Sequence, residues 1–339
     1  MRQLPLLVEG PHERAKRSAP PGHPGGRRCA VRLLSLVGLV WASSASAWSI
    51  TTEEAAALQQ DAARDLGVSA EREVTLPGGG ALKLVLVPGG QFTMGAPEGE
   101  SPVDPDESPQ FTARVHPFWM AACEITNAQF ALFDASHDSR FMDTYWKDRV
   151  GPGFPLNQPE QPVVRVSWRE AYRFCEWLSQ VTGERFRLPT EAEWEYACRA
   201  GSGGPFACPP GELSVYANLA DQSLAQVKPW ALRDDSLNDG QPVTCAVGRF
   251  RASVWGLLDM HGNVAEWCAS LYRPYPLAAL DVPAGLEETG PRVIRGGSFD
   301  DRPRRARSAF RLSYPPDQHV YNVGFRVVAP IRADATTER

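Results

Sequence analysis

Apolar positions recur at helical spacing in only a few segments of this chain. Between residues 168 and 181 they include Phe174 and Cys175 and lie three or four positions apart, which predicts a helix with one buried face. Residues 167–170 form a capping box at the start of this helix, and Gly183 follows its end. Side-chain caps therefore predict both of its boundaries.

Three further helices are predicted, over residues 51–66, 127–135 and 191–199. A threonine stands at or just before the start of each, where its hydroxyl can accept hydrogen bonds from the first free backbone amides. Trp194 and Ala197 lie on one face of the last helix and are expected in the core. The other segments are rich in Gly, Pro, Trp and Asn and leave room only for short strands.

Composition limits the class of protein. The chain has 339 residues, of which 43% are apolar, so it can bury a substantial core in one large or two ordinary domains. Its formal net charge is −5 and its isoelectric point is near 5.8. General binding to nucleic acid needs a concentrated basic face, and we therefore expect no nucleic-acid partner.

The N-terminal residues 1–47 are typical of a leader with a signal peptide. Basic residues at 27, 28 and 32 precede an apolar run over 33–41, and the small residues 45–47 supply a cleavage pattern. The run is too short to span a bilayer, and no later segment approaches the ~20 apolar residues that a membrane helix needs. We therefore expect an exported protein, periplasmic or secreted, with no stable membrane anchor.

Six cysteines follow the leader, and their even number in an exported chain permits up to three disulfides. Cys198 and Cys208 bracket a short glycine-rich loop and are the pair most easily closed. The spacing contains no paired C-x-x-C units, so zinc is not indicated. The six are Cys123, Cys175, Cys198, Cys208, Cys245 and Cys268.

Three sequence blocks carry a resemblance to a known family. They are RLPTEAEWEYACRAG at 187–201, LDMHGNVAEW at 258–267, and the segment from RVIRGGSF at 292–299 to NVGFR at 322–326. Together they closely resemble the formylglycine-generating enzyme family, also called the sulfatase-modifying-factor domain. The resemblance implies an α+β, C-type-lectin-like fold with few short helices and strands and many irregular loops.

The resemblance also divides the chain. Residues 81–332 are expected to form the sulfatase-modifying-factor-like domain as a single unit. Residues 48–80 would then be an N-terminal lead-in helix and linker, and residues 333–339 a tail.

The C-terminal block departs from the catalytic members of the family, in which two of its cysteines bind copper(I) and oxidise a substrate cysteine. Here the block contains no cysteine, and Ser308 stands at the position matching the second of them. Copper(I) is selected by soft ligands such as thiolates, and a serine hydroxyl stays protonated near neutral pH. We therefore expect no copper and no cysteine oxidase activity.

Oxygen ligands at a suitable spacing indicate calcium. Asp259 and Glu266 bracket a turn whose carbonyls at Gly262 and Val264 can point inward, and hard cations take six to eight oxygens. The family binds calcium at the matching positions. The alternative is that Asp259 and Glu266 only cap turns or pair with arginine.

The resemblance implies a second calcium site. It maps to the side chains of Asn218 and Asp239 and to the carbonyls of Leu219 and Gln241. In both sites the ion would have a structural role, because it would tie together loops with little regular hydrogen bonding of their own.

An arginine cluster between 302 and 311 stands beside several aromatic residues. One interpretation is a rim for an anionic or aromatic ligand, with Arg302 and Arg311 as pocket residues. The other is salt bridging to nearby carboxylates, which we favour for Arg304, Arg307 and Arg326. The predicted ligand pocket consists of Phe299, Asp300, Arg302, Ser308, Arg311 and Tyr314.

No other chemical motif is present. His261 has no second histidine at a ligand spacing and is expected to be a hydrogen-bonded core residue, so no transition metal is predicted. The sequence contains no nucleophile elbow, H-E-x-x-H motif, phosphate loop or dinucleotide fingerprint.

Three functional hypotheses follow. The first is an exported domain without copper and cysteine oxidase chemistry that binds a peptide, protein or small ligand through its C-terminal loops. The second is an oxidoreductase of the same family acting on a non-sulfatase substrate by a different mechanism. The third is a variable ligand-display receptor on the same scaffold.

Overall fold

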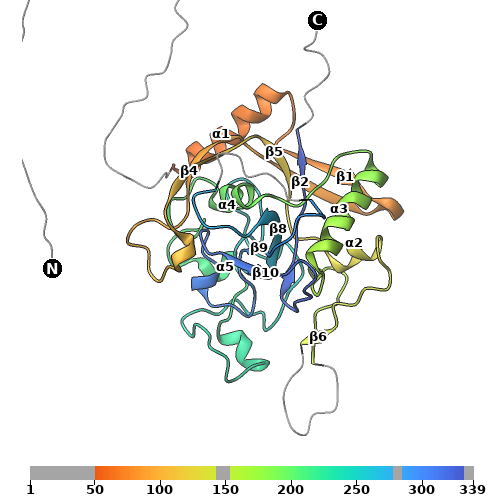
Figure 1. The fold of residues 1–339 in the computed structure, drawn as a ribbon. Coiled ribbons are helices and arrows are strands. Elements are labelled where there is room, and N and C mark those ends of the chain that lie inside the picture. Colours follow the sequence, from red (N-terminus) through yellow and green to blue (C-terminus); the bar gives the residue numbers. More distant parts are fainter. Residues whose placement is uncertain (1–49, 143–152, 278–284, 332–339) are drawn as a thin grey trace, which may run out of the picture. The chain divides into compact units, whose positions relative to one another are not determined.

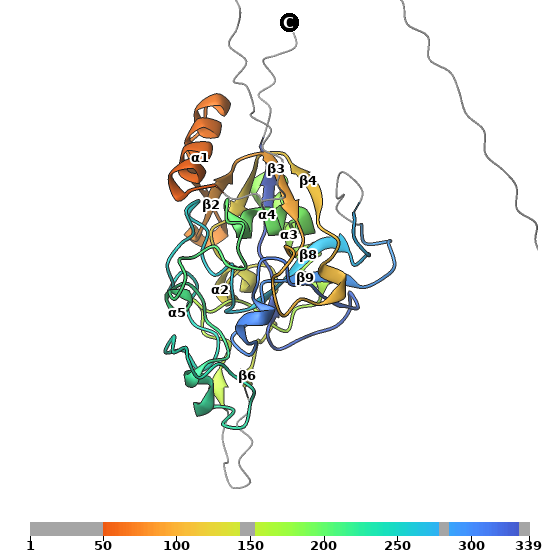
Figure 2. The same ribbon diagram turned by 90° about the vertical axis from the view of Figure 1, so that its left-hand side faces the viewer.

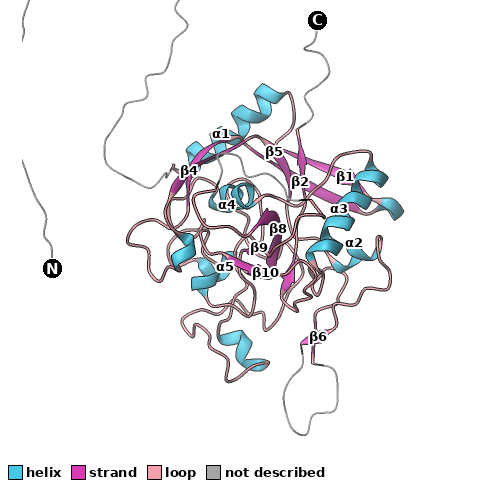
Figure 3. Cartoon of the chain, viewed as in Figure 1, coloured by secondary structure: helices cyan, strands magenta, loops and turns pink. Residues whose placement is uncertain are grey.

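The computed structural model describes residues 50–142, 153–277 and 285–331. The predicted leader and the tail after 332 lie outside these residues. Figure 3 shows that loops and turns form most of the described chain, in agreement with the many irregular loops that the family resemblance implies.

Five α-helices and twelve short strands are defined in the described residues. The helices are α1 (Thr52–Leu66), α2 (Asn127–Ala131), α3 (Trp168–Thr182), α4 (Glu191–Arg199) and α5 (Leu213–Tyr216). The strands are β1 (Glu71–Thr75), β2 (Ala81–Val87), β3 (Gly90–Met94), β4 (Phe111–Val115), β5 (Phe118–Ala121), β6 (Phe141–Met142), β7 (Phe154–Pro155), β8 (Ala265–Leu271), β9 (Arg292–Arg295), β10 (Leu312–Tyr314), β11 (Val323–Gly324) and β12 (Val328–Pro330). Four 3-10 turns complete the order: η1 (Pro77–Gly79), η2 (Pro105–Glu107), η3 (Gln222–Gln226) and η4 (Pro303–Arg305).

Two four-stranded sheets organise these elements. One has the order β1-β2-β5-β12, and the other has the order β10-β9-β8-β11. In the second sheet β11 runs parallel to β8, with Gly324 opposite Glu266. Helix α4 contacts both β3 and β4 on one side and β8 and β9 on the other, and it lies between these strands in Figures 1 and 2.

The predicted caps define three of the helices. Thr51, Ser167 and Thr190 each complete a capping box at the start of α1, α3 and α4, and Gly67 and Gly183 end the first two in the left-handed conformation. Phe174, Cys175, Trp194 and Ala197 are buried as predicted.

Helix α2 is shorter than predicted and ends at Ala131 instead of residue 135. The Asp134 carboxylate accepts hydrogen bonds from the backbone amide and the hydroxyl of Ser136, at 2.9 and 2.6 Å. This local turn competes with helical hydrogen bonding and gives the chain another path. The threonine cap predicts where this helix begins, but it carries no information about where the helix ends.

The N-terminal segment is part of the domain. Strand β1 pairs with β2 from Glu71↔Val85 to Thr75↔Ala81, so the predicted boundary between residues 80 and 81 would separate two paired strands. Helix α1 is fastened by Gln59, whose amide donates to the carbonyls of Leu86 and Trp255 at 2.8 and 2.9 Å. Residues 71–75, within the range 48–80 predicted as a lead-in helix and linker, therefore form a strand that is paired with the domain.

None of the described cysteines forms a disulfide, so the structure contains none of the predicted disulfides among them. Cys198 does not pair with Cys208; its sulfur lies near Ser308 and His261 instead. None of the helices in the described part of the chain combines the length and apolar character that crossing a bilayer requires.

We predict that Gln59→Ala lowers the free energy of unfolding by about 2 kcal/mol, because two buried carbonyl oxygens lose their donor. Gln60→Ala, at an exposed position of the same helix, serves as the control. Urea unfolding of both variants measures the difference. Equal stability of the two variants would show that α1 does not depend on this contact.

Candidate functional site

A buried ion pair joins β8 to the segment before β12. Both oxygens of Glu266 accept hydrogen bonds from the Arg326 guanidinium, at 2.6–2.9 Å, and Trp194 donates its indole N–H to Glu266 at 2.8 Å. Arg326 also donates to the carbonyls of Ala121, Ala122 and Leu258. Glu266 and Arg326 are both buried. The carboxylate predicted as a calcium ligand thus lies against an arginine.

A second buried cluster lies between α4 and the C-terminal block. Arg311 donates to both oxygens of Glu191, at 2.6 and 2.8 Å, while Arg295 pairs with Glu195. Burial would raise the pKa of Glu195, but Arg199 and Arg295 hold that pKa below its ordinary value. Arg311 is only 3% exposed. It is therefore a structural residue, and its predicted place on a pocket rim is wrong.

The loop before β8 needs glycine at position 262. Gly262 has a φ of +97°, and a Cβ atom there would lie 2.1 Å from the Asn218 carbonyl oxygen. The next residue, Asn263, donates its backbone N–H to that oxygen at 2.8 Å. This close approach brings the two predicted calcium sets, which begin at Asn218 and Asp259, into neighbouring loops.

The structure adds a carboxylate to the first predicted set. Asp259 and Glu124 interact inside the protein, and each has one buried oxygen with no hydrogen-bond partner among the described residues. The other oxygen of Asp259 accepts from the Gly248 amide at 2.7 Å, and that of Glu124 accepts from Asn263 at 3.1 Å. Burial raises the pKa of Asp259 to about 6. Burial, and after it the nearby Asp259 carboxylate, raises the pKa of Glu124 well above its usual range. The Arg326 guanidinium lowers both pKa values without cancelling the effect of burial, so two charged carboxylates here would be favoured by a further cation.

Glu124 was missed in the sequence because it lies far along the chain from Asp259. Its only local signal is a position directly before the apolar and capping residues that begin α2. No spacing rule connects Glu124 to the loop of Asp259, which follows more than a hundred positions later along the chain.

The second predicted calcium set is brought together around Asp239. Its carboxylate accepts from the backbone amides of Leu219 and Gln241, at 2.8 and 2.7 Å. Asn218 contributes a buried side-chain oxygen that has no partner among the described residues. Burial raises the pKa of Asp239 to about 7, and neighbouring Asp221 adds to the shift.

These oxygens fit a hard cation better than a transition metal. Within the described residues, no three His, Cys, Asp or Glu side chains are grouped so that they could hold a metal ion. A calcium ion in the first set would bind Asp259 and Glu124, and one in the second set would bind Asp239. In either set, amide and backbone carbonyl oxygens would supply the other ligands. Such mixed oxygen sets are typical of calcium.

Ser308 is buried beside a thiol. The Cys198 sulfur lies 3.6 Å from the Ser308 hydroxyl and 3.7 Å from both ring nitrogens of His261. Burial raises the pKa of Cys198 to about 12 and lowers that of His261 to about 4. Both groups are therefore neutral at physiological pH. His261 is hydrogen-bonded to the Ala306 carbonyl at 2.7 Å, as expected of a core histidine.

The six residues predicted to form a ligand pocket do not lie together. Phe299 and Ser308 are buried, Arg311 pairs with Glu191, and Tyr314 packs at 6.4 Å from the ring of Trp267. Only Asp300 and Arg302 line a common hollow, which has a volume of about 320 Å³. Its walls are Leu232, Asp300, Asp301, Arg302, Arg304 and Arg305.

Most charges in this hollow are internally paired. Lys228 lies 2.5 Å from Asp300, which also accepts from the Tyr321 hydroxyl. Asp301 accepts from the Ser298 hydroxyl at 2.6 Å and from Arg305 at 3.1 Å. The exposed Arg302 forms no hydrogen bond or ion pair with another described side chain.

The other arginines of the block follow the salt-bridge interpretation. Arg307 pairs with Glu100 and Glu107 at 2.5 and 2.6 Å, and Arg326 pairs with Glu266. Arg304 approaches Asp104 at 3.9 Å. The arginine cluster is therefore mainly structural, and Arg302 differs from the others in being exposed without a hydrogen-bond or ion-pair partner among the described side chains.

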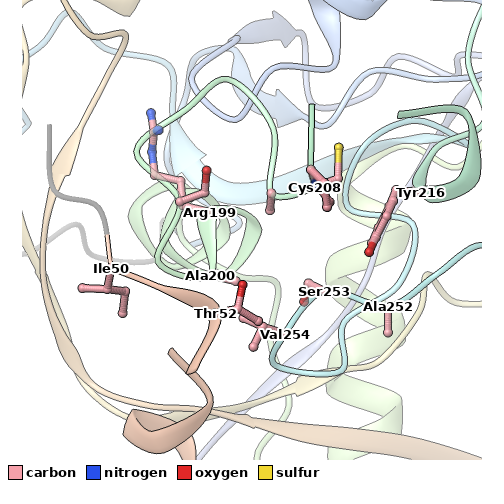
Figure 4. A pocket seen from close by; sticks show the side chains of 12 residues that line it. Ile50, Thr52, Arg199, Ala200, Cys208, Tyr216, Ala252, Ser253 and Val254 are labelled. Carbon is pink, nitrogen blue, oxygen red and sulfur yellow. The ribbon is translucent and has the colours of Figure 1, made fainter. Parts of the chain in front are cut away.

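A further cavity, of about 460 Å³, lies beside the end of α4 (Figure 4). Cys208, Tyr216 and Ser253 line it, together with Ile50 from the start of the described chain. Burial raises the pKa of Cys208 to about 11, which keeps this thiol protonated. No residue of the predicted sites lines this cavity.

Comparison with known proteins gives consistent matches. A family profile described as "Sulfatase-modifying factor enzyme 1-like domain" matches residues 71–331. The formylglycine-generating enzyme of Streptomyces coelicolor is 31% identical over 286 residues, which cover 71% of this chain and 87% of that protein. The mouse protein named inactive C-alpha-formylglycine-generating enzyme 2 is 28% identical, with 72% and 84% covered.

The fold is also found in a solved structure. PvdO from Pseudomonas aeruginosa has a TM-score of 0.60 and 31% identity, and the match covers 74% of this chain and 94% of PvdO. The predicted C-type-lectin-like architecture with irregular loops is confirmed by this similarity.

We predict that Arg311→Met lowers the free energy of unfolding by about 3 kcal/mol, because it removes the bidentate partner of buried Glu191. Arg302→Met changes the same side-chain type on the surface and should alter stability by less than about 0.5 kcal/mol. Thermal and urea unfolding of the matched variants measure both effects. A similar loss in the two variants would contradict the separation of Arg311 from the surface hollow.

Proposed function

The chain belongs to the sulfatase-modifying factor enzyme 1-like domain family, and we propose that it binds a ligand through its C-terminal loops without oxidising cysteine. Family membership alone does not decide the activity, because its relatives include both formylglycine-generating enzymes and a protein named as inactive. The observation that carries the proposal is the hollow at Asp300 and Arg302, in a block that contains no thiol.

The donor set argues against copper chemistry. A copper(I) site of the kind that the family resemblance implied needs a pair of soft thiolates. Ser308 offers a hydroxyl, and its neighbour Cys198 is a single buried thiol whose pKa is raised to about 12. These residues do not fit copper(I), and no oxidation step is assigned to them.

The C-terminal hollow supports binding of a peptide, protein or small ligand. It is lined by the turn 300–305 and by Leu232, which approaches it from a distant part of the chain. The buried Arg311–Glu191 and Arg307–Glu107 pairs fix the chain on the C-terminal side of this turn. The turn is thus held in place and can present Arg302 without ordering a flexible loop first.

Calcium is proposed as a structural cofactor. Asp259 with Glu124, and Asp239 with Asn218, would supply side-chain oxygens, and carbonyls such as those of Gly262, Val264, Leu219 and Gln241 would complete the sets. The unpartnered buried oxygens of Asn218, Glu124 and Asp259 support this assignment. Glu266 is an unsuitable charged ligand while Arg326 occupies both of its oxygens.

Export to the periplasm or the exterior also belongs to this proposal. Its support is the sequence pattern of the leader, which lies outside the described residues.

The absence of oxidase activity can be tested directly. Mature protein loaded with copper should leave a sulfatase-type cysteine peptide unchanged, since the soft thiolate pair is missing. Mass spectrometry of the peptide measures the product, with a formylglycine-generating enzyme as positive control. An aldehyde product above the no-protein background would overturn this part of the proposal.

The calcium assignment predicts a calcium-dependent stability. At a concentration ~100-fold above Kd, an ion that binds only the folded state adds about 2.7 kcal/mol, so chelation should lower the Tm of the wild type. Asp259→Asn should respond less to calcium because a charged ligand is lost. Asp317→Asn, at an exposed position, is the control.

Differential scanning fluorimetry and calorimetric titration with calcium measure these effects. If Asp259→Asn shows the wild-type shift and Asp239→Asn loses it, the ion is held only by the second set. If both variants retain the wild-type shift, neither predicted set binds calcium.

A further inference from the structure

We propose that the hollow at residues 300–305 recognises an acidic segment of another protein, with the acidic side chain on Arg302 and an apolar neighbour on Leu232. This inference rests on the proposed function and names the class of partner for the same hollow. The partner chemistry follows from two features of the surface: its unpaired cation and its exposed apolar residues.

The charge of the hollow favours an anion. Asp300 is neutralised by Lys228, and Asp301 is held by Arg305 and Ser298, so the two carboxylates in the wall already have donors. Arg302 is exposed and has no hydrogen-bond or ion-pair partner among the described side chains. A guanidinium in this position can donate two parallel hydrogen bonds to a carboxylate.

The apolar part of the surface comes from the turn after η3. Leu232 lines the hollow and is 76% exposed, and Trp230 in the same turn is 62% exposed. Hydrogen bonds from Ala231 to the Lys228 carbonyl, and from Arg233 to the Pro229 carbonyl, fold this turn. The ion pair of Lys228 with Asp300 then fixes the turn against the hollow.

These features are typical of a protein interface. Small-molecule sites are usually deep and mostly apolar, whereas five of the six residues lining this hollow are charged. Exposed tryptophan and arginine side chains are enriched where proteins bind one another and contribute much of the affinity. A partner segment that carries an acidic residue beside an apolar one matches both parts of the surface.

Nucleic acid fits less well. The formal net charge of the chain is −5, and Asp300 and Asp301 lie inside the hollow. A backbone with a phosphate at every nucleotide would meet these carboxylates, while a single acidic side chain can be placed on Arg302 alone.

The test uses a display library of short random peptides, selected against the full mature chain. We expect the selected peptides to be enriched in Asp or Glu next to an aromatic or aliphatic residue. Their affinities, measured by fluorescence anisotropy, should fall about tenfold for Arg302→Glu and also for Leu232→Ser, since each change removes one anchor.

Two matched controls lie on α1, away from the hollow. Arg64→Glu and Leu58→Ser change the same residue types at exposed positions and should leave the affinities unchanged. Thermal unfolding of all four variants checks that each remains folded. Because the changed side chains are exposed or half-exposed, losses of stability should be small.

The outcomes separate this inference from the proposed function. Peptides whose binding depends on Leu232 but not on Arg302 would overturn the acidic partner and leave a ligand site at the hollow. Peptides insensitive to both changes, or failure to select any peptide, would overturn both. Displacement of an acidic peptide by single-stranded oligothymidine at an equal concentration would also overturn the inference, in favour of a nucleic-acid ligand.

Discussion

Buried arginine–glutamate pairs are the constraint on which the rest of this structure depends. Arg326 with Glu266, and Arg311 with Glu191, connect the C-terminal block to β8 and α4. Removing charges from water is costly, so such pairs persist only where geometry and extra hydrogen bonds compensate. Here Arg326 also donates hydrogen bonds to three backbone carbonyls. Such donors matter in this fold because few of its carbonyls are paired within long strands or helices.

The same pairs separate the structural part of the C-terminal block from its exposed part. Arg307 and Arg311 are fixed by carboxylates from distant segments, and this arrangement holds the chain directly after the turn at 300–305. The turn can then present Arg302 in a hollow that Leu232 also lines. A rigid support for an exposed recognition element reduces the entropy lost when a partner binds.

Signals within a few neighbouring residues predicted much of the fold. The site was harder to predict because it depends on which distant residues lie close together in space. The bounds of α1, α3 and α4 followed from caps because a cap acts within a few residues. Among the pocket residues, Arg302 and Arg311 have the same side chain in the same block, yet one is exposed and the other is buried on Glu191. Sequence spacing could not distinguish them, because their environments come from other parts of the chain.

The sequence by itself determined the helix caps, the family, and the absence of cysteine from the C-terminal block. Only the tertiary structure decided which distant groups meet: Glu124 with Asp259, Arg326 with Glu266, and Leu232 with the turn at 300–305. The physical reason is that desolvation and Coulomb energies depend on burial and on distance in space. In a fold built mainly of loops, neither quantity follows from the separation of two residues along the chain.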